Sequence, residues 1–108
     1  MSQLNLTTGN CLADNGSIGT NTAGYGVTIK EGTNAKMGTA VLNSTTAVTV
    51  ATTAVTATSR IMLTTQSPSG TALGTPYVSG RTAGTSFSIK STGTSDTSTV
   101  AWVIFDPS

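Results

Sequence analysis

The sequence predicts an all-β fold: a compact antiparallel β-sandwich or jelly-roll-like barrel with an extended N-terminal arm. Three observations support this prediction. Short runs of alternating valine, isoleucine and threonine recur about every 8–12 residues, punctuated by Gly, Asn and Pro. No stretch carries apolar residues at the 3.6-residue period of a helix. The chain also ends in a dense apolar run, residues 98–105, which is too short and too β-branched to favour a helix.

Residues 1–36 differ from the rest of the chain and are expected to form the arm. Residues 3–7 and 25–30 could each pair as a short strand, whereas residues 8–24 are small and polar, with a turn signal at Asn15-Gly16. A stretch this long without apolar periodicity is expected to run across another surface rather than enter a core. The apolar side chains expected to make that contact are Leu4, Leu6, Tyr25, Val27 and Ile29.

Residues 37–108 are expected to form the sandwich. The expected strands are residues 38–42, 47–51, 60–65, 77–79 continuing into 81–83, 86–90 and 98–105. Residues 52–58 either continue the second strand or cross to another sheet, and residues 67–76 read as a long exposed loop. The side chains expected to face the core are Val41, Val48, Val50, Ile61, Leu63, Phe87, Ile89, Val100, Trp102 and Ile104.

The last strand is apolar on both of its alternating faces. Val100, Trp102 and Ile104 form one set, and Ala101, Val103 and Phe105 form the other. Such a strand is usually covered on both sides. We therefore expect the core on one side and either a neighbouring sheet or another subunit on the other.

The composition limits the partners of this domain. Charged residues make up only 8% of the chain, the net charge is +1, and the few Lys and Arg are scattered, so a nucleic-acid or acidic-membrane surface is not expected. The chain is also poor in large apolar side chains, so a monomer would bury a thin core. Small domains of this kind are often stabilised by self-association, so we expect this chain to bind copies of itself.

The residue types that carry most catalysis are missing. The chain has no His and one Cys, Cys11, and its four carboxylates, Asp14, Glu31, Asp96 and Asp106, are widely spaced in turns or connectors. No metal site, phosphate loop or Ser-Lys pair is recognisable in the sequence. We expect no enzymatic activity, no cofactor and no metal.

A few polar and aromatic residues are candidates for binding. In a chain with so little charge, Arg60 and Arg81 could pair with Asp96, with Asp106 or with a carboxylate on a partner subunit, or could simply be solvated. Tyr25 and Tyr77, together with the loop at residues 67–76, could offer a surface for a glycan.

Four segments of the chain carry a family resemblance: residues 31–42 (EGTNAKMGTAVL), 48–64 (VTVATTAVTATSRIMLT), 81–89 (RTAGTSFSI) and 96–107 (DTSTVAWVIFDP). On these segments, about two-thirds of the chain resembles a domain common in virion proteins of tailed bacteriophages. The resemblance implies a β-rich, trimeric, non-enzymatic domain of the kind found on capsid decoration proteins, head fibres and tail-fibre tips. It supplies no catalytic residues.

Within that resemblance, the short chain without a shaft favours a capsid decoration, or cement, protein. Such a protein would bind the major capsid protein on the outer surface of the virion and stabilise the shell, after synthesis in the host cytoplasm without a signal peptide. The alternative is a tail-fibre or head-fibre tip that binds a host-surface glycan.

Overall fold

A computed structural model describes residues 19–108 of the protein. The strand expected at residues 3–7, and Leu4 and Leu6 of the expected arm, lie outside the described residues. Cys11 and Asp14 lie outside them as well.

The described residues form eight β-strands. Six of them belong to two three-stranded sheets with the orders β1-β8-β3 and β2-β6-β5, and the two shortest form the pair β4-β7. The strands are β1 (Met37–Val41), β2 (Val48–Ala51), β3 (Arg60–Ser67), β4 (Gly70–Ala72), β5 (Pro76–Thr82), β6 (Ser86–Ser91), β7 (Ser95–Asp96) and β8 (Thr99–Phe105).

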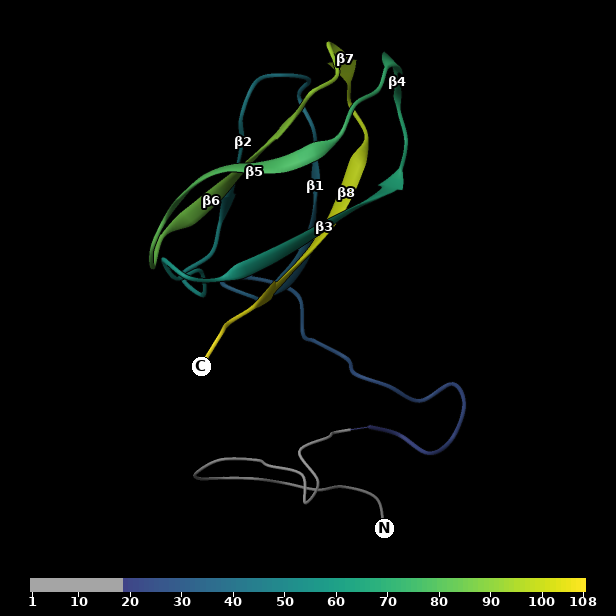
Figure 1. Cartoon of the computed structure of the whole chain (residues 1–108), viewed down its shortest axis with the longest axis vertical. Helices are drawn as coiled ribbons and strands as arrows, with labels where there is room; N and C mark the ends of the chain where they lie inside the picture. The colour runs from purple at the N-terminus through teal and green to yellow at the C-terminus, as the bar shows by residue number, and fades with distance from the viewer. Residues whose placement is uncertain (1–18) are drawn as a thin grey trace.

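The two larger sheets pack face to face as a sandwich, and every strand pair is antiparallel (Figure 1). The last strand, β8, lies at the centre of its sheet, where Trp102 pairs with Gly38 of β1 and with Leu63 of β3. The pair β4-β7 lies at the end of the molecule opposite the C-terminus (Figure 1). The predicted all-β sandwich is confirmed.

The core fills the space between the two sheets. Its fully buried apolar side chains are Leu42, Val55, Phe87, Ile89, Val100, Trp102 and Ile104, with Ala40, Val50, Ile61, Leu63 and Val78 packed partly buried against them. Phe87 and Trp102 join the sheets through an edge-to-face contact, with ring centroids 5.2 Å apart and an interplanar angle of 78°. Val48 is half-buried on β2.

The expectation that Val41 faces the core is wrong. Its side chain is 59% exposed, whereas the next residue, Leu42, is 2% exposed. Gly38 and Ala40 of β1, and Leu42 directly after it, lie on the inner side. The predicted inward residue, Val41, is therefore one position away from the residue that is buried. Because side chains alternate along a strand, a slip of one residue moves the whole set to the opposite face.

The segment between β2 and β3 contributes to the core, which the sequence pattern did not indicate. Residues 52–58 form turns rather than a strand, yet Val55 is 1% exposed. Thr52 is also buried, and its hydroxyl donates to the carbonyl of Ala35 over 2.7 Å. This hydrogen bond anchors the chain just before β1 to the body of the sandwich.

Residues 19–36 contain no strand. The stretch 25–30, expected as a possible strand, lies outside both sheets in Figure 1, and none of the strands formed by residues 19–108 runs beside it. Two of its apolar side chains are strongly exposed, Tyr25 at 75% and Val27 at 85%. That this stretch pairs with another protein remains a prediction.

The position of Gly38 beneath the Trp102 ring gives a first testable prediction. A Cβ atom at Gly38 would lie 2.8 Å from Cζ2 of Trp102, closer than packed carbon atoms approach each other. We expect Gly38→Ala to lower the free energy of unfolding by about 1–3 kcal/mol, because the indole must shift within a packed core. Urea unfolding followed by tryptophan fluorescence measures this loss.

Gly26→Ala is the matched control, because a Cβ atom there meets nothing within 4 Å. Equal stability of Gly38→Ala and Gly26→Ala would contradict the close packing of the Trp102 ring against β1.

Candidate functional site

One end of the sandwich is rich in exposed hydroxyl groups. We call this region the tip; it consists of residues 67–76, including β4, and residues 92–97, including β7. The two segments are joined by side-chain hydrogen bonds between Thr71 and Ser95 (3.1 Å) and between Thr97 and Ser69 (3.1 Å), and the amide of Thr75 donates to Thr92 Oγ1 (2.8 Å). The segment expected as a long loop is therefore exposed but fixed in conformation.

A buried carboxylate holds the tip from the inside. Asp96 is 1% exposed, and both of its oxygens accept hydrogen bonds within the chain. Ser91 Oγ donates to Oδ2 and Ser98 Oγ donates to Oδ1, each over 2.6 Å. The amides of Gly74 and Ser98 complete the set at 3.1 Å. The carboxylate thus links the tip segment of Gly74 to the ends of β6 and β8.

These donors stabilise the charged form of Asp96. The Ser91 hydroxyl, then the Ser98 hydroxyl and the two amides, hold the pKa of the carboxyl well below its usual range, although burial acts in the opposite direction. Four hydrogen-bond donors compensate the ionised carboxylate for the water that it loses on burial. Protonation would take away part of its capacity to accept these hydrogen bonds. Asp96 therefore has a structural role, because its hydrogen bonds connect the tip to the body of the sandwich.

Gly70 allows the close approach of the two tip segments. Its φ is +112°, and a Cβ atom there would lie 2.0 Å from the carbonyl oxygen of Ser95. Only glycine fits this backbone conformation and this spacing.

The possible ion pair of Asp96 with Arg60 or Arg81 does not form within residues 19–108. Asp96 is buried inside the protomer, and its oxygens already accept hydrogen bonds from the hydroxyls of Ser91 and Ser98 and from two amides. Arg81 instead donates to the carbonyl of Ser59, and Arg60 makes only a long contact, 3.4 Å, to the carbonyl of Thr58.

Asp106 also has partners within the chain. Lys36 forms an ion pair with it, and the hydroxyls of Ser59 and Thr56 donate to its other oxygen. Lys36, then Ser59, lower the pKa of Asp106 below its ordinary value. These contacts fasten the end of β8 to the segments before β1 and β3. Pairing of Arg60, Arg81 or Asp106 across a subunit boundary remains a prediction.

The residues expected to bind a glycan are not gathered in one place. Tyr25 lies in the segment before β1, whereas Tyr77 is the second residue of β5 and directly follows the tip segment. Tyr77 is 42% exposed and pairs with Lys90 of β6 on the outer face of the β2-β6-β5 sheet. Tyr77 and Lys90 therefore border the tip, whereas Tyr25 belongs to a separate surface.

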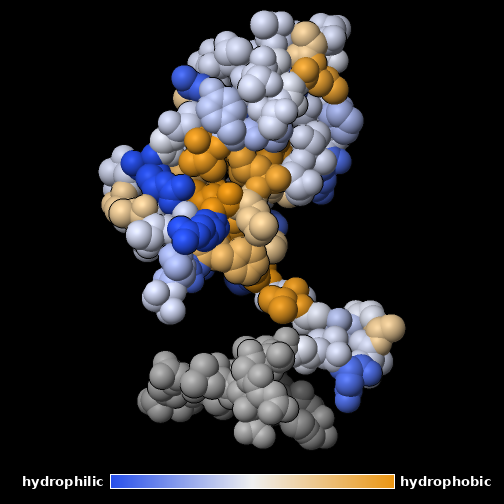
Figure 2. Space-filling view, viewed as in Figure 1, coloured by the Kyte–Doolittle hydropathy of each residue, from blue (hydrophilic) through white to orange (hydrophobic). Residues whose placement is uncertain are grey.

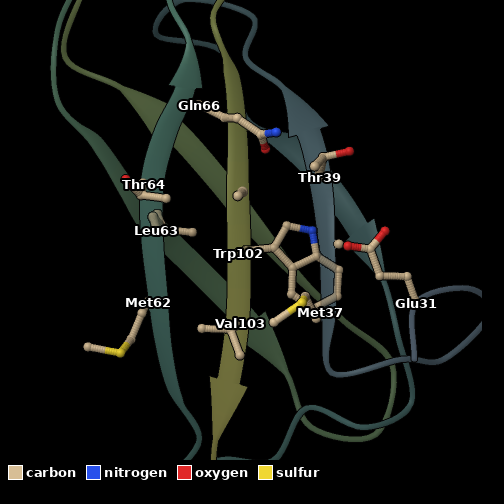
Figure 3. Close-up of a pocket in the computed structure, with 11 residues that line it drawn as sticks. Glu31, Met37, Thr39, Met62, Leu63, Thr64, Gln66, Trp102 and Val103 are labelled. Carbon is tan, nitrogen blue, oxygen red and sulfur yellow. The ribbon is translucent and has the colours of Figure 1, made fainter. Parts of the chain in front are cut away.

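A shallow groove of about 700 Å³ runs across the outer face of the β1-β8-β3 sheet (Figure 3). One end is apolar, with Met37, Met62 and Val103, and the other end is polar, with Thr39, Thr64 and Gln66 (Figure 3). Glu31 lies beyond the β1 edge with its carboxylate directed towards that strand (Figure 3). The groove carries one carboxylate and no group that could act as its acid or base partner.

The described residues offer no recognisable metal centre: no three His, Cys, Asp or Glu side chains gather anywhere in residues 19–108. No helix capable of crossing a membrane occurs in that range.

The sequence pattern did not indicate two of these features, the Asp96 cluster and the groove. The spacing of Asp96 and Ser98 is a local signal, because an Asp side chain often accepts from the amide two residues later. The contributions of Ser91 and Gly74 come from other segments and have no such signal. The groove depends on which side chains of three strands share a face.

Comparison with known proteins shows a family match. The family described as "K1 capsule-specific polysaccharide lyase, C-terminal domain" matches residues 34–105. No curated protein and no solved structure matches the chain. The matched range begins just before β1 and ends with the last residue of β8.

Proposed function

Because the chain belongs to the family of the C-terminal domain of K1 capsule-specific polysaccharide lyases, we propose that it is a non-enzymatic bacteriophage virion-surface domain of the tail-fibre type that binds a host-surface glycan. The family membership is the observation that carries the proposal. The family is named after an enzyme that acts on a capsule polysaccharide, and the matched part is the C-terminal domain of that enzyme. A domain of this family would work where a virion meets polysaccharide.

We assign glycan binding to the tip and to Tyr77 beside it. The tip presents exposed hydroxyls of Ser69, Thr71 and Thr75, which both donate and accept hydrogen bonds, as sugars do. Tyr77 adds a half-exposed ring, and Lys90 adds a cation for a hydroxyl or carboxylate of the polysaccharide. The Asp96 hydrogen bonds fix the tip before binding, which lowers the entropy lost when a ligand binds.

The capsid cement function, expected from the sequence, is the second candidate. The family membership supports it less well than it supports the tail-fibre alternative. Its specific support is the exposure of Tyr25 and Val27 ahead of β1, where Ile29 is half-buried. An extended segment with such side chains suits strand addition to the major capsid protein.

The copy number in purified virions separates the two candidates. Quantitative mass spectrometry of virions would give a few copies per particle for a tail-fibre domain. Hundreds of copies, together with capsids that burst more easily when the protein is missing, would instead establish the cement function.

Replacement of Tyr77 by alanine tests the proposed glycan surface. We expect Tyr77→Ala to weaken polysaccharide binding about tenfold, because a central aromatic contact is typically worth more than about 1 kcal/mol. The measurement is biolayer interferometry of the full chain on immobilised capsule polysaccharide from the phage host.

Tyr77→Phe keeps the ring and is expected to retain most of the binding. Tyr25→Ala is the positional control and should bind as the wild type does. Loss of binding in Tyr25→Ala with full binding in Tyr77→Ala would move the site to the segment before β1.

A further inference from the structure

The two outer faces of the sandwich differ in chemistry. The outer face of β2-β6-β5 carries Thr49, Ser86, Ser88, Lys90 and Tyr77, which are mainly polar. The opposite outer face, on β1-β8-β3, carries more apolar side chains, together with Thr39, Thr64, Gln66 and Thr99. We call it the apolar face after its apolar members, which are Met37, Val41, Met62, Ala101, Val103 and Phe105.

Several of these side chains are largely exposed. Met62 is 60% exposed, Val41 59% and Phe105 54%. The register places Met37, Val103 and Met62 side by side across the three strands of this sheet. Figure 2 shows hydrophobic surface over β3 that continues towards β5, with strongly hydrophilic side chains at one end. A contiguous exposed apolar area on a small domain usually marks an interaction surface. The composition of β8, apolar on both faces, agrees with a second cover on this side.

Two opposite charges lie at opposite borders of the apolar face. Arg60 pairs in register with Phe105 and therefore shares its face at the β3 edge. Glu31 lies at the β1 edge (Figure 3). Within residues 19–108 the ion pair is Lys36–Asp106, so neither Glu31 nor Arg60 has a partner of opposite charge there.

From these observations we propose that the apolar face packs against a second copy of this chain, with Glu31 of one copy beside Arg60 of the next. The strands β1 and β3 are the two edges of one sheet, with β8 between them. A rotation axis parallel to β8 therefore sets the β1 edge of each copy against the β3 edge of its neighbour. Unlike charges then meet at every contact, and the apolar side chains of all copies face the axis.

Each copy has a net charge of only +1, so electrostatic repulsion between copies is weak. The rim charges also oppose the alternative in which like edges meet, because that would bring two Glu31 or two Arg60 side chains together. The apolar face does not include Tyr77 or the tip, so this inference does not depend on the proposed glycan site.

Sedimentation equilibrium of the full chain at tens of micromolar is the first test. We expect the wild type to sediment as an oligomer, three copies being the number that the resemblance to phage virion domains implies. Met62→Arg should shift it to the 10.8 kDa monomer, because an exposed position on the apolar face receives a charge that would be buried between copies.

Thr49→Arg is the matched control, an exposed strand position on the polar outer face. It should leave the oligomer intact. Circular dichroism of both variants checks that the fold is retained. A monomeric wild type, or an unchanged oligomer in Met62→Arg, would overturn the proposal.

A charge exchange tests the pairing of Glu31 with Arg60. Glu31→Arg alone and Arg60→Glu alone should each weaken association about tenfold, and the double variant should restore it. The single effects should diminish at high salt. If the double variant associates no better than the single variants, the assigned ion pair is wrong, whatever the first test shows.

Discussion

Replacing Trp102 by alanine is expected to leave little or no folded protein. The ring is 6% exposed, packs edge-to-face on Phe87 and covers Gly38, so its removal opens a cavity between the two sheets. Losses of about 3–5 kcal/mol are typical for such a change. A small domain has about 5–15 kcal/mol in total, and this core is thin, so the loss is a large share of it. Urea unfolding monitored by circular dichroism is the measurement.

Trp102→Phe is the matched variant. The indole Nε1 is buried and has no hydrogen-bond partner among the described residues, so phenylalanine removes a donor that stabilises nothing. The variant keeps an aromatic ring against Phe87, and we expect a much smaller loss than for alanine. A native-like, stable Trp102→Ala protein would show that β8 does not anchor the core.

Replacement of Asp96 is expected to have the second-largest effect. Asp96→Asn places an amide group among four donors, so at least one hydroxyl or amide of Ser91, Ser98 or Gly74 loses its acceptor. We expect the thermal midpoint to fall by about 10 °C or more, which is the scale of unsatisfied buried groups in a domain of this size.

Asp106→Asn is the comparison, because Asp106 is partly exposed at the end of the sandwich. The thermal midpoint should fall less in Asp106→Asn than in Asp96→Asn. Differential scanning calorimetry of both variants decides the order, and an equal or reversed order would contradict the structural role of Asp96.

The same carboxylates set the acid limit of stability. The pKa of Asp96 is lower in the folded protein than its ordinary value of 3.8, and that of Asp106 is lowered too. Their contribution is therefore fully present above the ordinary value and is lost as the pH falls further towards the folded-state values. We expect the wild-type midpoint to fall steeply below about pH 4 and Asp96→Asn to show a shallower fall.

Much of the fold follows from local patterns. The alternation around Phe87 and Ile89, and around Val100, Trp102 and Ile104, places these side chains in the buried core, where the structure has them. At β1 the same pattern was ambiguous, because Gly38, Ala40 and Leu42 compete with Thr39 and Val41 for the inner side. Glycine and alanine give a weak apolar signal, although they are the residues that leave room for the Trp102 ring.

The candidate site was less accessible to such reasoning. The sequence indicated an exposed segment at residues 67–76, which forms one part of the tip, and it singled out Tyr77, which borders the tip. It gave no indication that Asp96 fixes this segment, because the donors come from Ser91, Ser98 and Gly74 on separate parts of the chain. Gly74, for example, lies 22 residues before Asp96 in the sequence.

By itself, then, the sequence determined the strand-forming character of the chain, its low charge and a last strand that is apolar on both faces. These are properties of single segments or of the overall composition, so they can be read from the alternation of residue types and from residue counts. Only the tertiary structure decided which strands are neighbours, that Asp96 is buried and satisfied, and that Met62, Val103 and Phe105 share an uncovered face with Glu31 and Arg60 at its borders. The physical reason is that strand pairing brings together residues distant in the chain, and burial and charge pairing depend on those neighbours.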